Sequence, residues 1–292
     1  ASVNNLLNFQ KTFRQSEIFI LNINYRSTPQ ILRACQNLIS HNVRKIEKTL
    51  KTDNPEGDEV IVLESSSEEG EALSIVNEVR ELTERRGYQY KDCAVLYRAN
   101  FQSRTIEETF SQMKIPYHIE NGLNFYQRSE VRHLLDYLRV ISSPDSDDGD
   151  DALKSILNVP NRYISRKFVQ ELTEFSSKQN VHLYEGLKLL PVDLPYLRIN
   201  VKNFIKLMSP LVDFAPNLEP SEVIQTLRNE LDYDRWCTDE DVPQPDDAKI
   251  ANLNQLQLSA ARYSSIRDFL EYTDSFDEQM SNDKKGVALM TI

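Results

Sequence analysis

The chain has 292 residues and a formal net charge of −11 at pH 7, with 40% hydrophobic and 27% charged residues. This composition is typical of a globular protein and argues against a disordered chain. No apolar run approaches the ~20 residues of a membrane-spanning helix, and the start lacks the basic and apolar segments of a signal peptide. Three cysteines and four histidines, all scattered, argue against a disulfide framework or a zinc site and favour an intracellular protein.

The charge is unevenly distributed along the chain. Residues 1–52 hold eight Lys and Arg against two Asp and Glu, so the rest of the chain carries a net charge of −17. This asymmetry is compatible with a basic face that meets nucleic-acid phosphates on an otherwise acidic protein. A solvated basic helix is the alternative interpretation.

The first part of the chain alternates between strand and helix patterns. Runs rich in β-branched and aromatic residues predict strands over 17–23, 58–63, 92–97 and 116–120. Helical spacing predicts a helix that begins at Thr28-Pro29 and continues through Ile39, and further helices over 68–86 and 103–114. Strands that alternate with helices of about ten or more residues predict a mostly parallel sheet.

The second part is almost entirely helical in pattern. From residue 128 to about 283 the periodicity predicts helices, among them 152–157, 165–179 and 220–231, with acidic loops at 144–151 and 239–247. The run 286–292 is again typical of a buried strand. We therefore expect an α/β domain (1–125) with a helical insertion (126–284) and a last strand (285–292) that returns to the sheet.

Polar and aromatic residues follow several of the predicted strands. Tyr25 and Arg26 follow the first strand, Arg98 and Asn100 the third, and Thr291 ends the last. Ligands of parallel α/β sheets bind at the carboxyl ends of the strands. Arginine can bind a phosphate through two hydrogen bonds, and a tyrosine ring can stack on a base. For any one of these clusters, simple packing remains the alternative.

Several motifs of catalysis are absent from the sequence. There is no phosphate-binding G-x-x-x-x-G-K-[ST] loop, and no Ser/His/Asp or Cys/His order stands out. The residues alone thus predict an α/β domain with an edge suited to phosphates.

Ordered blocks of the sequence resemble one protein family. "LNINYRST" with the helix after it resembles motif IV of the UvrD/PcrA/Rep family of superfamily 1 DNA helicases, and "AVLYRANFQSRTIEETF" resembles the next block. "ALKSILNVPNR" resembles the start of the helical subdomain of that family, and "GVALMTI" resembles the first half of motif V. The resemblance implies a fragment with the RecA-like domain 2A and its helical insertion 2B, without domains 1A and 1B.

The resemblance also implies roles for individual residues. Tyr25 matches the tyrosine that stacks on the adenine of ATP, and Arg26 the arginine that reaches the γ-phosphate from across the domain interface. Arg98, Asn100 and Thr291 match positions that contact single-stranded DNA. ATP and Mg²⁺ need domain 1A, so we expect no ATPase activity from this chain alone. The whole protein is expected to unwind DNA from 3′ to 5′ at single-strand/duplex junctions, in repair or replication.

One segment departs from the family pattern. Where the family commonly has R-G-I-G, this chain has Arg162-Tyr163-Ile164-Ser165. Arg162, Ser165 and Arg166 remain candidate duplex contacts, although Ser165 is equally typical of a helix N-cap. The other functions considered are the motor part of a helicase–nuclease subunit and a non-catalytic DNA-binding or scaffold protein. The expected location is a bacterial cytoplasm, or the nucleus or mitochondrion of a eukaryote.

Overall fold

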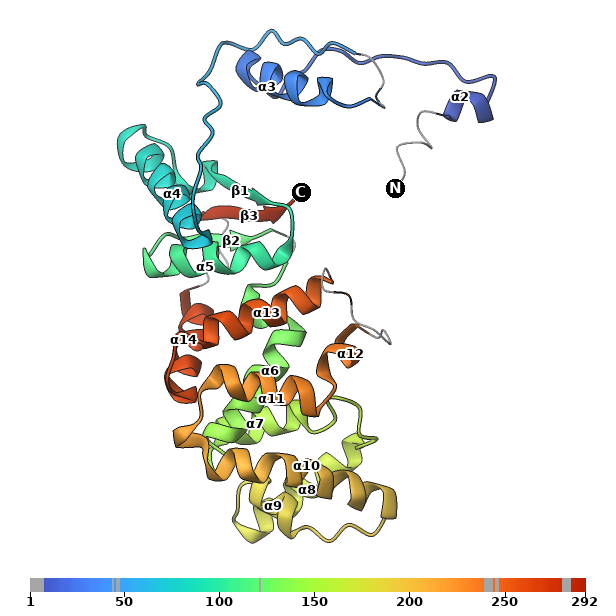
Figure 1. Ribbon diagram of the computed structural model, residues 1–292, viewed down its shortest axis with the longest axis vertical. Helices are drawn as coiled ribbons and strands as arrows, with labels where there is room; N and C mark the ends of the chain where they lie inside the picture. Colours follow the sequence, from blue (N-terminus) through green and yellow to red (C-terminus); the bar gives the residue numbers. More distant parts are fainter. Residues whose placement is uncertain are drawn as a thin grey trace. The chain divides into compact units, whose positions relative to one another are not determined.

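The structure is a computed structural model that describes residues 8–43, 45, 48–120, 122–238, 244, 247–279 and 285–292. The chain divides into two compact units, one up to Glu64 and one from Ser65 to Ile292 (Figure 1).

The main element of the first unit is helix α3 (Pro29–Ser40), which follows a short helix, α2 (Phe9–Thr12). Thr28 precedes α3 in an extended conformation, and Pro29 occupies its first position, as the sequence predicts. The side chains of Gln30 and Leu32 are buried. The predicted helix is therefore confirmed.

The two strands predicted in the first unit differ from the structure. Residues 17–23 and 58–63 contain no strand, and only Ile23 forms an isolated parallel bridge, to Lys51. A strand needs a continuous ladder of hydrogen bonds to a neighbour, and the described part of this unit provides only that one bridge. Phe19 and Leu21 consequently remain 82% and 85% exposed.

The second unit contains a parallel sheet of three strands, β1 (Ala94–Tyr97), β2 (Tyr117–Ile119) and β3 (Val287–Thr291), in the order β1-β3-β2. The strands predicted over 92–97, 116–120 and 286–292 are thus confirmed, as is the return of the last strand to the sheet. Gly286 allows this return, because a Cβ atom there would lie 2.6 Å from the backbone of Pro116. The mixed α/β fold with a parallel sheet agrees with the predicted class.

Helices and short helical turns surround the sheet: α4 (Glu68–Arg80), η1 (Glu81–Arg85), η2 (Tyr90–Asp92), η3 (Asn100–Gln102) and α5 (Ser103–Gln112). The Ser67 side chain accepts a hydrogen bond from Gly70 N and caps α4. A small apolar core joins the inner side chains of α4 and α5 to those of the strands, including Val76, Phe110 and Leu289.

Between Phe125 and Gln279 the regular elements of the described residues are all helical, and they lie on one side of the sheet in Figure 1. They are η4 (Phe125–Gln127), α6 (Ser129–Ser142), α7 (Asp147–Ile156), α8 (Arg166–Gln179), α9 (Leu183–Leu189), α10 (Pro195–Asp213), η5 (Ala215–Asn217), α11 (Pro220–Glu230), α12 (Tyr233–Thr238), α13 (Ala248–Ala260) and α14 (Ile266–Gln279). Their apolar faces form a second, larger core around α6. Among the described residues, none of the helices combines the length and apolarity that a bilayer crossing requires.

The first predicted acidic loop is largely helical. Helix α7 begins at Asp147 rather than near residue 152, and the Ser146 side chain caps it by accepting a hydrogen bond from Gly149 N. Asp147, Asp148 and Asp150 occupy the first turn, where negative charge is favoured by the helix dipole. A run of aspartates therefore starts a helix here. Most of the second predicted acidic loop lies outside the described residues.

Candidate functional site

In the first unit, a tight turn holds the backbone around Tyr25 and Arg26. The side-chain oxygen of Asn24 accepts hydrogen bonds from Arg26 N at 3.0 Å and from Ser27 N at 2.7 Å. Asn24 N in turn donates to the carbonyl of Lys51. Asparagine stabilises such turns because its short side chain can replace a backbone acceptor. The turn directs the chain from the extended segment into α3.

Two further amide side chains hold this turn against the chain that follows α3. Asn54 donates to the carbonyl of Ser27 at 3.2 Å, and the Gln30 side chain accepts from Gly57 N at 3.0 Å. The turn is therefore fixed from three sides by neutral amides, which leave its charged and aromatic side chains free for other contacts.

Tyr25 and Arg26 themselves point into solvent. The Tyr25 side chain is 81% exposed, and Arg26 is also exposed. Within the described residues, the Arg26 guanidinium makes neither a hydrogen bond nor an ion pair. A cation and an aromatic ring side by side on a held turn can bind a phosphate and stack on a base, respectively. The structure thus leaves both side chains available for the predicted roles.

In the second unit, the carboxyl edge of the sheet brings Arg98 and Thr291 together. Tyr97 and Thr291 are partners in the β1–β3 register, and Ile292 N donates to the Tyr97 carbonyl. Arg98 therefore emerges beside the end of the last strand. Both Arg98 and Thr291 are exposed.

The backbone after β1 is satisfied by a single side chain. Gln102 accepts hydrogen bonds from Arg98 N at 3.1 Å and from Ala99 N at 2.9 Å. Asn100 begins the turn η3, and its carbonyl accepts a hydrogen bond from the Ser103 hydroxyl at 2.9 Å. The side chains of Arg98 and Asn100 are exposed and have no partner among the described residues. The sheet edge thus offers a cation and an amide beside Thr291.

A buried carboxyl group lies beneath this edge. Glu107 is 1% exposed; its Oε2 accepts from Phe125 N at 3.1 Å, and its Oε1 has no partner among the described residues. Burial raises the pKa of Glu107 to about 7, and the nearby Ser103, the Phe125 N–H and Arg128 oppose the shift. Sequence patterns do not indicate this buried carboxyl, because a glutamate on a helix is usually at the surface.

Arg128 links the sheet edge to the helices. Its guanidinium donates to Ser103 Oγ and to Asn252 Oδ1, both at 2.8 Å, and lies 5.3 Å from the centre of the Phe125 ring. Burial lowers the pKa of Arg128, and Glu107 raises it. The neighbouring residues Phe125 and Tyr126 are buried. This segment therefore packs the sheet and the helices of the unit together.

The guanidinium of Arg162 forms hydrogen bonds within the helical part of the second unit. One nitrogen donates to the carbonyls of residues 156, 157, 159 and 160 at 2.8–3.3 Å, and the other donates to the Tyr137 hydroxyl at 2.6 Å. The group also lies 5.1 Å from the centre of the Phe204 ring. These contacts direct both terminal nitrogens of the guanidinium to groups of the chain itself.

Ser165 and Arg166 lie at the start of α8. The Ser165 hydroxyl accepts a hydrogen bond from Phe168 N at 3.3 Å, so it acts as the N-cap that the sequence pattern also allowed. Arg166 is exposed and has no partner among the described residues. Of these three predicted duplex contacts, Arg166 is the one whose side chain is available.

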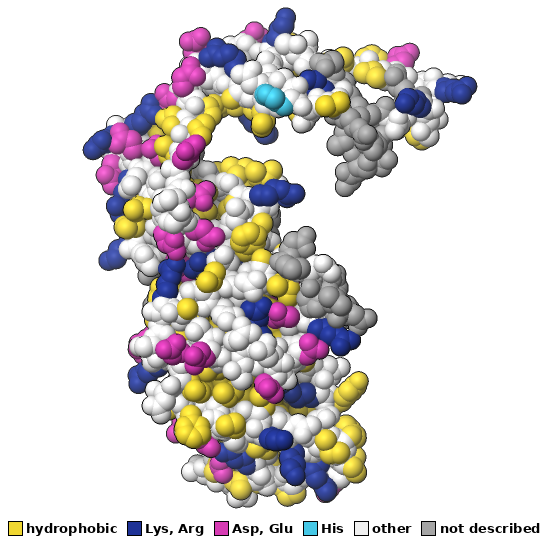
Figure 2. Space-filling model, in the orientation of Figure 1, with side chains coloured by type: hydrophobic (Ala, Val, Ile, Leu, Met, Phe, Trp, Pro, Cys, Tyr) yellow, Lys and Arg dark blue, Asp and Glu magenta, His cyan; other side chains and the backbone are white. Residues whose placement is uncertain are grey.

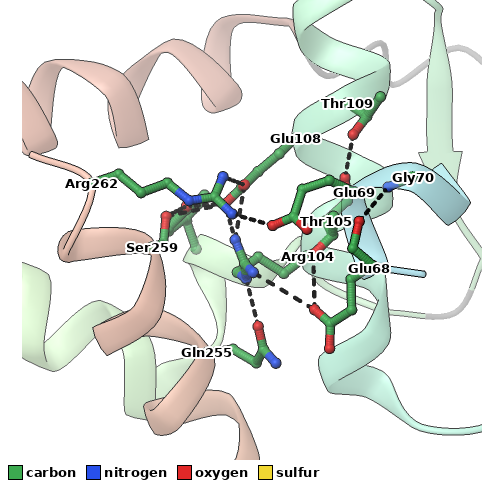
Figure 3. Close-up of polar contacts among 12 residues, drawn as sticks. Glu68, Glu69, Gly70, Arg104, Thr105, Glu108, Thr109, Gln255, Ser259 and Arg262 are labelled. Carbon is green, nitrogen blue, oxygen red and sulfur yellow. Dashed lines mark hydrogen bonds and ion pairs between the residues drawn. The ribbon is translucent and has the colours of Figure 1, made fainter. Parts of the chain in front are cut away.

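A second group of buried charges joins α4 and α5 to α13 (Figure 3). Arg104 donates to both oxygens of Glu108 at 2.9 Å and to Gln255 at 2.9 Å. Arg262 pairs with Glu69 and lies 3.6 Å from Glu108. Each buried charge therefore has a counter-charge and further hydrogen bonds, which is the condition for burying it at tolerable cost.

No sequence signal pointed to this group. In α5 only Ile106 and Phe110 are large apolar residues, so the pattern predicts a surface helix with one narrow buried stripe. Yet most of its polar side chains are buried too: Ser103, Arg104, Thr105, Glu107, Glu108 and Ser111. The spacing of Arg104 and Glu108 by four residues indicates an ion pair but not its burial.

Known proteins that are similar to this chain include ATP-dependent DNA helicases of bacteria. The family model described as "UvrD-like helicase C-terminal domain" matches residues 19–292. The ATP-dependent DNA helicase PcrA of Staphylococcus epidermidis is 30% identical over the whole chain, and that of Leuconostoc citreum is 29% identical over 96% of it. The ATP-dependent DNA helicase Rep of Buchnera aphidicola is 32% identical over 82% of the chain. The matched regions span 41%, 35% and 37% of these relatives, respectively.

Proposed function

This chain belongs to the UvrD-like helicase C-terminal family, and from that premise we propose that it is part of an ATP-dependent 3′-to-5′ DNA helicase of the UvrD type. In this proposal it supplies a trans arginine and half of a single-stranded DNA track. The chain spans about two fifths of the length of the curated relatives that it matches, so the remaining parts of the motor lie on other segments of the protein.

The observation that carries the proposal is the exposed pair Tyr25 and Arg26 on its held turn. An arginine whose guanidinium has no partner among the described residues is suited to meet a phosphate that arrives from outside this chain. During phosphoryl transfer negative charge spreads over the γ-phosphate oxygens, and an arginine from the opposing domain stabilises it. Arg26 is assigned that role, and Tyr25 is assigned stacking on the adenine.

ATP and Mg²⁺ are the implied cofactors. The exposed aromatic ring and the neighbouring cation fit the base and the phosphates of ATP, and bound Mg²⁺·ATP supplies the phosphoryl group that is transferred. The 292 residues contain no G-x-x-x-x-G-K-[ST] loop. We therefore assign the binding of Mg²⁺ and the β-phosphate to domain 1A, outside this chain.

The sheet edge is assigned to the DNA. Arg98 and Asn100, with Thr291 beside Arg98, present a cation, an amide and a hydroxyl at the carboxyl ends of parallel strands. Such groups contact the phosphates and sugars of a nucleic acid without reading its sequence. Arg166 is retained as a candidate contact to duplex DNA at a single-strand/duplex junction, whereas Arg162 and Ser165 are assigned to the fold.

The division into domain 2A (1–125 and 285–292) and helical subdomain 2B (126–284) belongs to the same proposal. It is supported by the helical content of the described residues between Phe125 and Gln279, and by the place of β3 between β1 and β2. The relatives named above are bacterial proteins, which favours a bacterial cytoplasm and a role in DNA repair or replication.

The test is Arg26→Ala in the complete enzyme. We expect kcat for DNA-stimulated ATP hydrolysis to fall at least ~1000-fold, because the transition-state charge loses its arginine, while affinity for single-stranded DNA stays nearly unchanged. Arg33→Ala is the matched control, since Arg33 is an exposed arginine of α3 that pairs with Glu59 within its own unit. An equal loss of DNA affinity and kcat would refute the assigned role, as would clear ATP turnover by this chain alone.

A further inference from the structure

Tyr163 combines a strained backbone with an exposed ring. Its φ angle is +56°, in the left-handed region that residues with a Cβ rarely adopt, and its side chain is 74% exposed. Holding a bulky residue in this conformation costs free energy, and an exposed ring gains little from burial in return. Such strain persists only where the surrounding structure imposes it, and it is frequent at functional sites.

The surrounding loop does impose this conformation. Asn158 accepts hydrogen bonds from Arg162 N and Ile164 N, and Asn161 accepts one from Tyr163 N at 2.9 Å. Asn200 of α10 donates to the carbonyl of Arg162 at 2.7 Å, and the Arg162 guanidinium binds the carbonyls that precede it. The backbone on both sides of Tyr163 is thus held, which fixes the point at which its side chain leaves the loop.

Beside Tyr163 there is a groove of about 660 Å³ between this loop, α10 and α11. Its walls are partly apolar, with Phe204 and Leu207, and partly amide, with Asn161 and Asn203. This volume lies within the ~300–1,000 Å³ range of small-molecule sites. An aromatic ring, an apolar wall and amide groups together suit a flat heterocycle that also forms hydrogen bonds, such as a nucleobase.

Positive charge on one side of the groove suits the phosphates of a nucleotide. Helix α10 carries Arg198, Lys202 and Lys206 at intervals of four residues, which places them on one face, and all three are exposed. The Arg198 guanidinium donates to the carbonyls of Val192 and Asp193, so Lys202 and Lys206 are the cations suited to phosphates. No acidic residue lies between Asp193 and Asp213. Figure 2 shows Lys and Arg side chains next to hydrophobic ones over these helices, at the lower end of the view. Glu230 lies on the α11 side of the groove, so phosphates are favoured only on the α10 side.

From these observations we infer that the groove beside Tyr163 binds an unpaired base of single-stranded DNA, stacked on the Tyr163 ring, with its phosphates along Lys202 and Lys206. This inference rests on the proposed DNA-binding function and adds a second contact to that of the sheet edge. Stacking on an aromatic ring tolerates every base, so the site would not select a sequence.

The experiment measures binding of the whole 292-residue chain to a thymidine oligonucleotide of about 15 nucleotides, and to an abasic strand of the same length. Tyr163→Leu removes the ring, Tyr163→Gly removes it together with the backbone strain, and Tyr163→Phe keeps it. Tyr196→Leu is the matched control, because Tyr196 is an exposed tyrosine of α10 outside the groove. A 5-iodouridine in the oligonucleotide allows photo-crosslinking, and mass spectrometry identifies the attached peptide.

We expect Tyr163→Leu and Tyr163→Gly to lower affinity for the thymidine strand ~5- to 150-fold, the range that corresponds to stacking of one base. Tyr163→Phe and Tyr196→Leu should bind normally, the abasic strand should be insensitive to all four changes, and the crosslink should map to Tyr163. Unchanged affinity in both ring-less variants, or an equal loss on the abasic strand, would overturn the inference and leave the sheet edge as the DNA contact. If the unaltered chain binds neither strand, the proposed DNA-binding function itself fails.

Discussion

Two loops of this chain each carry an arginine that the sequence placed among the DNA contacts, and the fold treats the two arginines in opposite ways. After β1, the backbone amides are satisfied by Gln102, and the Arg98 side chain remains free of partners among the described residues. Before α8, four carbonyls converge on the Arg162 guanidinium. Whether an arginine is available to a ligand therefore depends on which neighbouring backbone groups lack another partner.

The largest effect is expected when Arg162, the arginine that is used inside the fold, is replaced. Arg162→Met should lower the free energy of unfolding by about 3 kcal/mol, because it leaves the converging carbonyls without their charged donor in a partly buried site. Urea unfolding measures this change. Arg166→Ala, four residues further on and exposed, should stay within about 0.5 kcal/mol. An Arg162→Met variant of normal stability with weakened DNA binding would return Arg162 to the DNA contacts.

A second test concerns the buried side of the sheet edge, at Glu107. Its pKa of about 7 lies above the ordinary value of 4.5, so between these values the folded chain holds a proton that the unfolded chain has lost. Stability from this group is therefore fully present below about pH 4.5 and is lost as pH rises through 7. Between about pH 5 and pH 8 the loss should be roughly 2 kcal/mol.

Glu107→Gln tests this pH dependence directly. Glutamine imitates the protonated carboxyl, so the variant should show a flatter dependence of stability on pH than the unaltered chain, by that amount. Denaturant unfolding at a series of pH values is the measurement. Glu171→Gln, at an exposed position of α8, should leave the profile unchanged. Parallel profiles for the unaltered chain and Glu107→Gln would show that the buried carboxyl is ionised throughout.

The complementary test replaces Arg98, the arginine whose side chain is free of partners among the described residues. Arg98→Ala should leave stability within about 0.5 kcal/mol, since its side chain has no partner in the described structure, and should weaken single-stranded DNA binding roughly tenfold. The slope of log affinity against log salt should fall by about 0.7, the value for one phosphate contact on a single strand. Arg267→Ala, an exposed arginine of α14, is the control. An unchanged salt slope would exclude a phosphate contact by Arg98.

The smallest expected effect concerns the strain beside Arg162. Tyr163→Gly should raise the free energy of unfolding by roughly 0.5–1 kcal/mol, because glycine adopts positive φ without a steric penalty, although it also loses more entropy on folding. Tyr163→Ala keeps the Cβ atom and so should bring no such gain. Thermal unfolding of both variants is the measurement. An equal change in the two variants would show that the strain is relieved elsewhere in the loop.

The sequence allowed the sheet and its neighbours to be predicted well. Strands around Val95, Tyr117 and Leu289 have strong β patterns, and parallel pairing follows from the helices between them. The segments 17–23 and 58–63 have patterns of similar strength, yet the described structure gives them no ladder. A strand pattern shows that the side chains are suited to a sheet. It does not show whether a partner strand lies beside the segment.

Some features of the candidate sites could likewise be predicted from the sequence, and others could not. The exposure of Tyr25, Arg26, Arg98 and Asn100 agrees with their expected roles, because each follows an extended segment and lies on a short turn. The internal use of Arg162 could not be predicted, because it depends on carbonyls gathered from residues 156–160 and on Phe204 from another helix. The buried charges of α5 were missed for the same reason: Gln255 and Ser259 lie about 150 residues away in the chain.

Local chemistry was therefore enough to predict the strands of the three-stranded sheet and the helix starts at Pro29 and, with Ser165 as its N-cap, at Arg166. These features depend on neighbours within a few positions of the chain. The tertiary structure was needed to establish which charges are buried, how β3 enters between β1 and β2, and that the ring of Tyr163 stands beside a groove. Those features arise where distant segments meet, and the energy of a side chain there depends on partners that no local pattern contains.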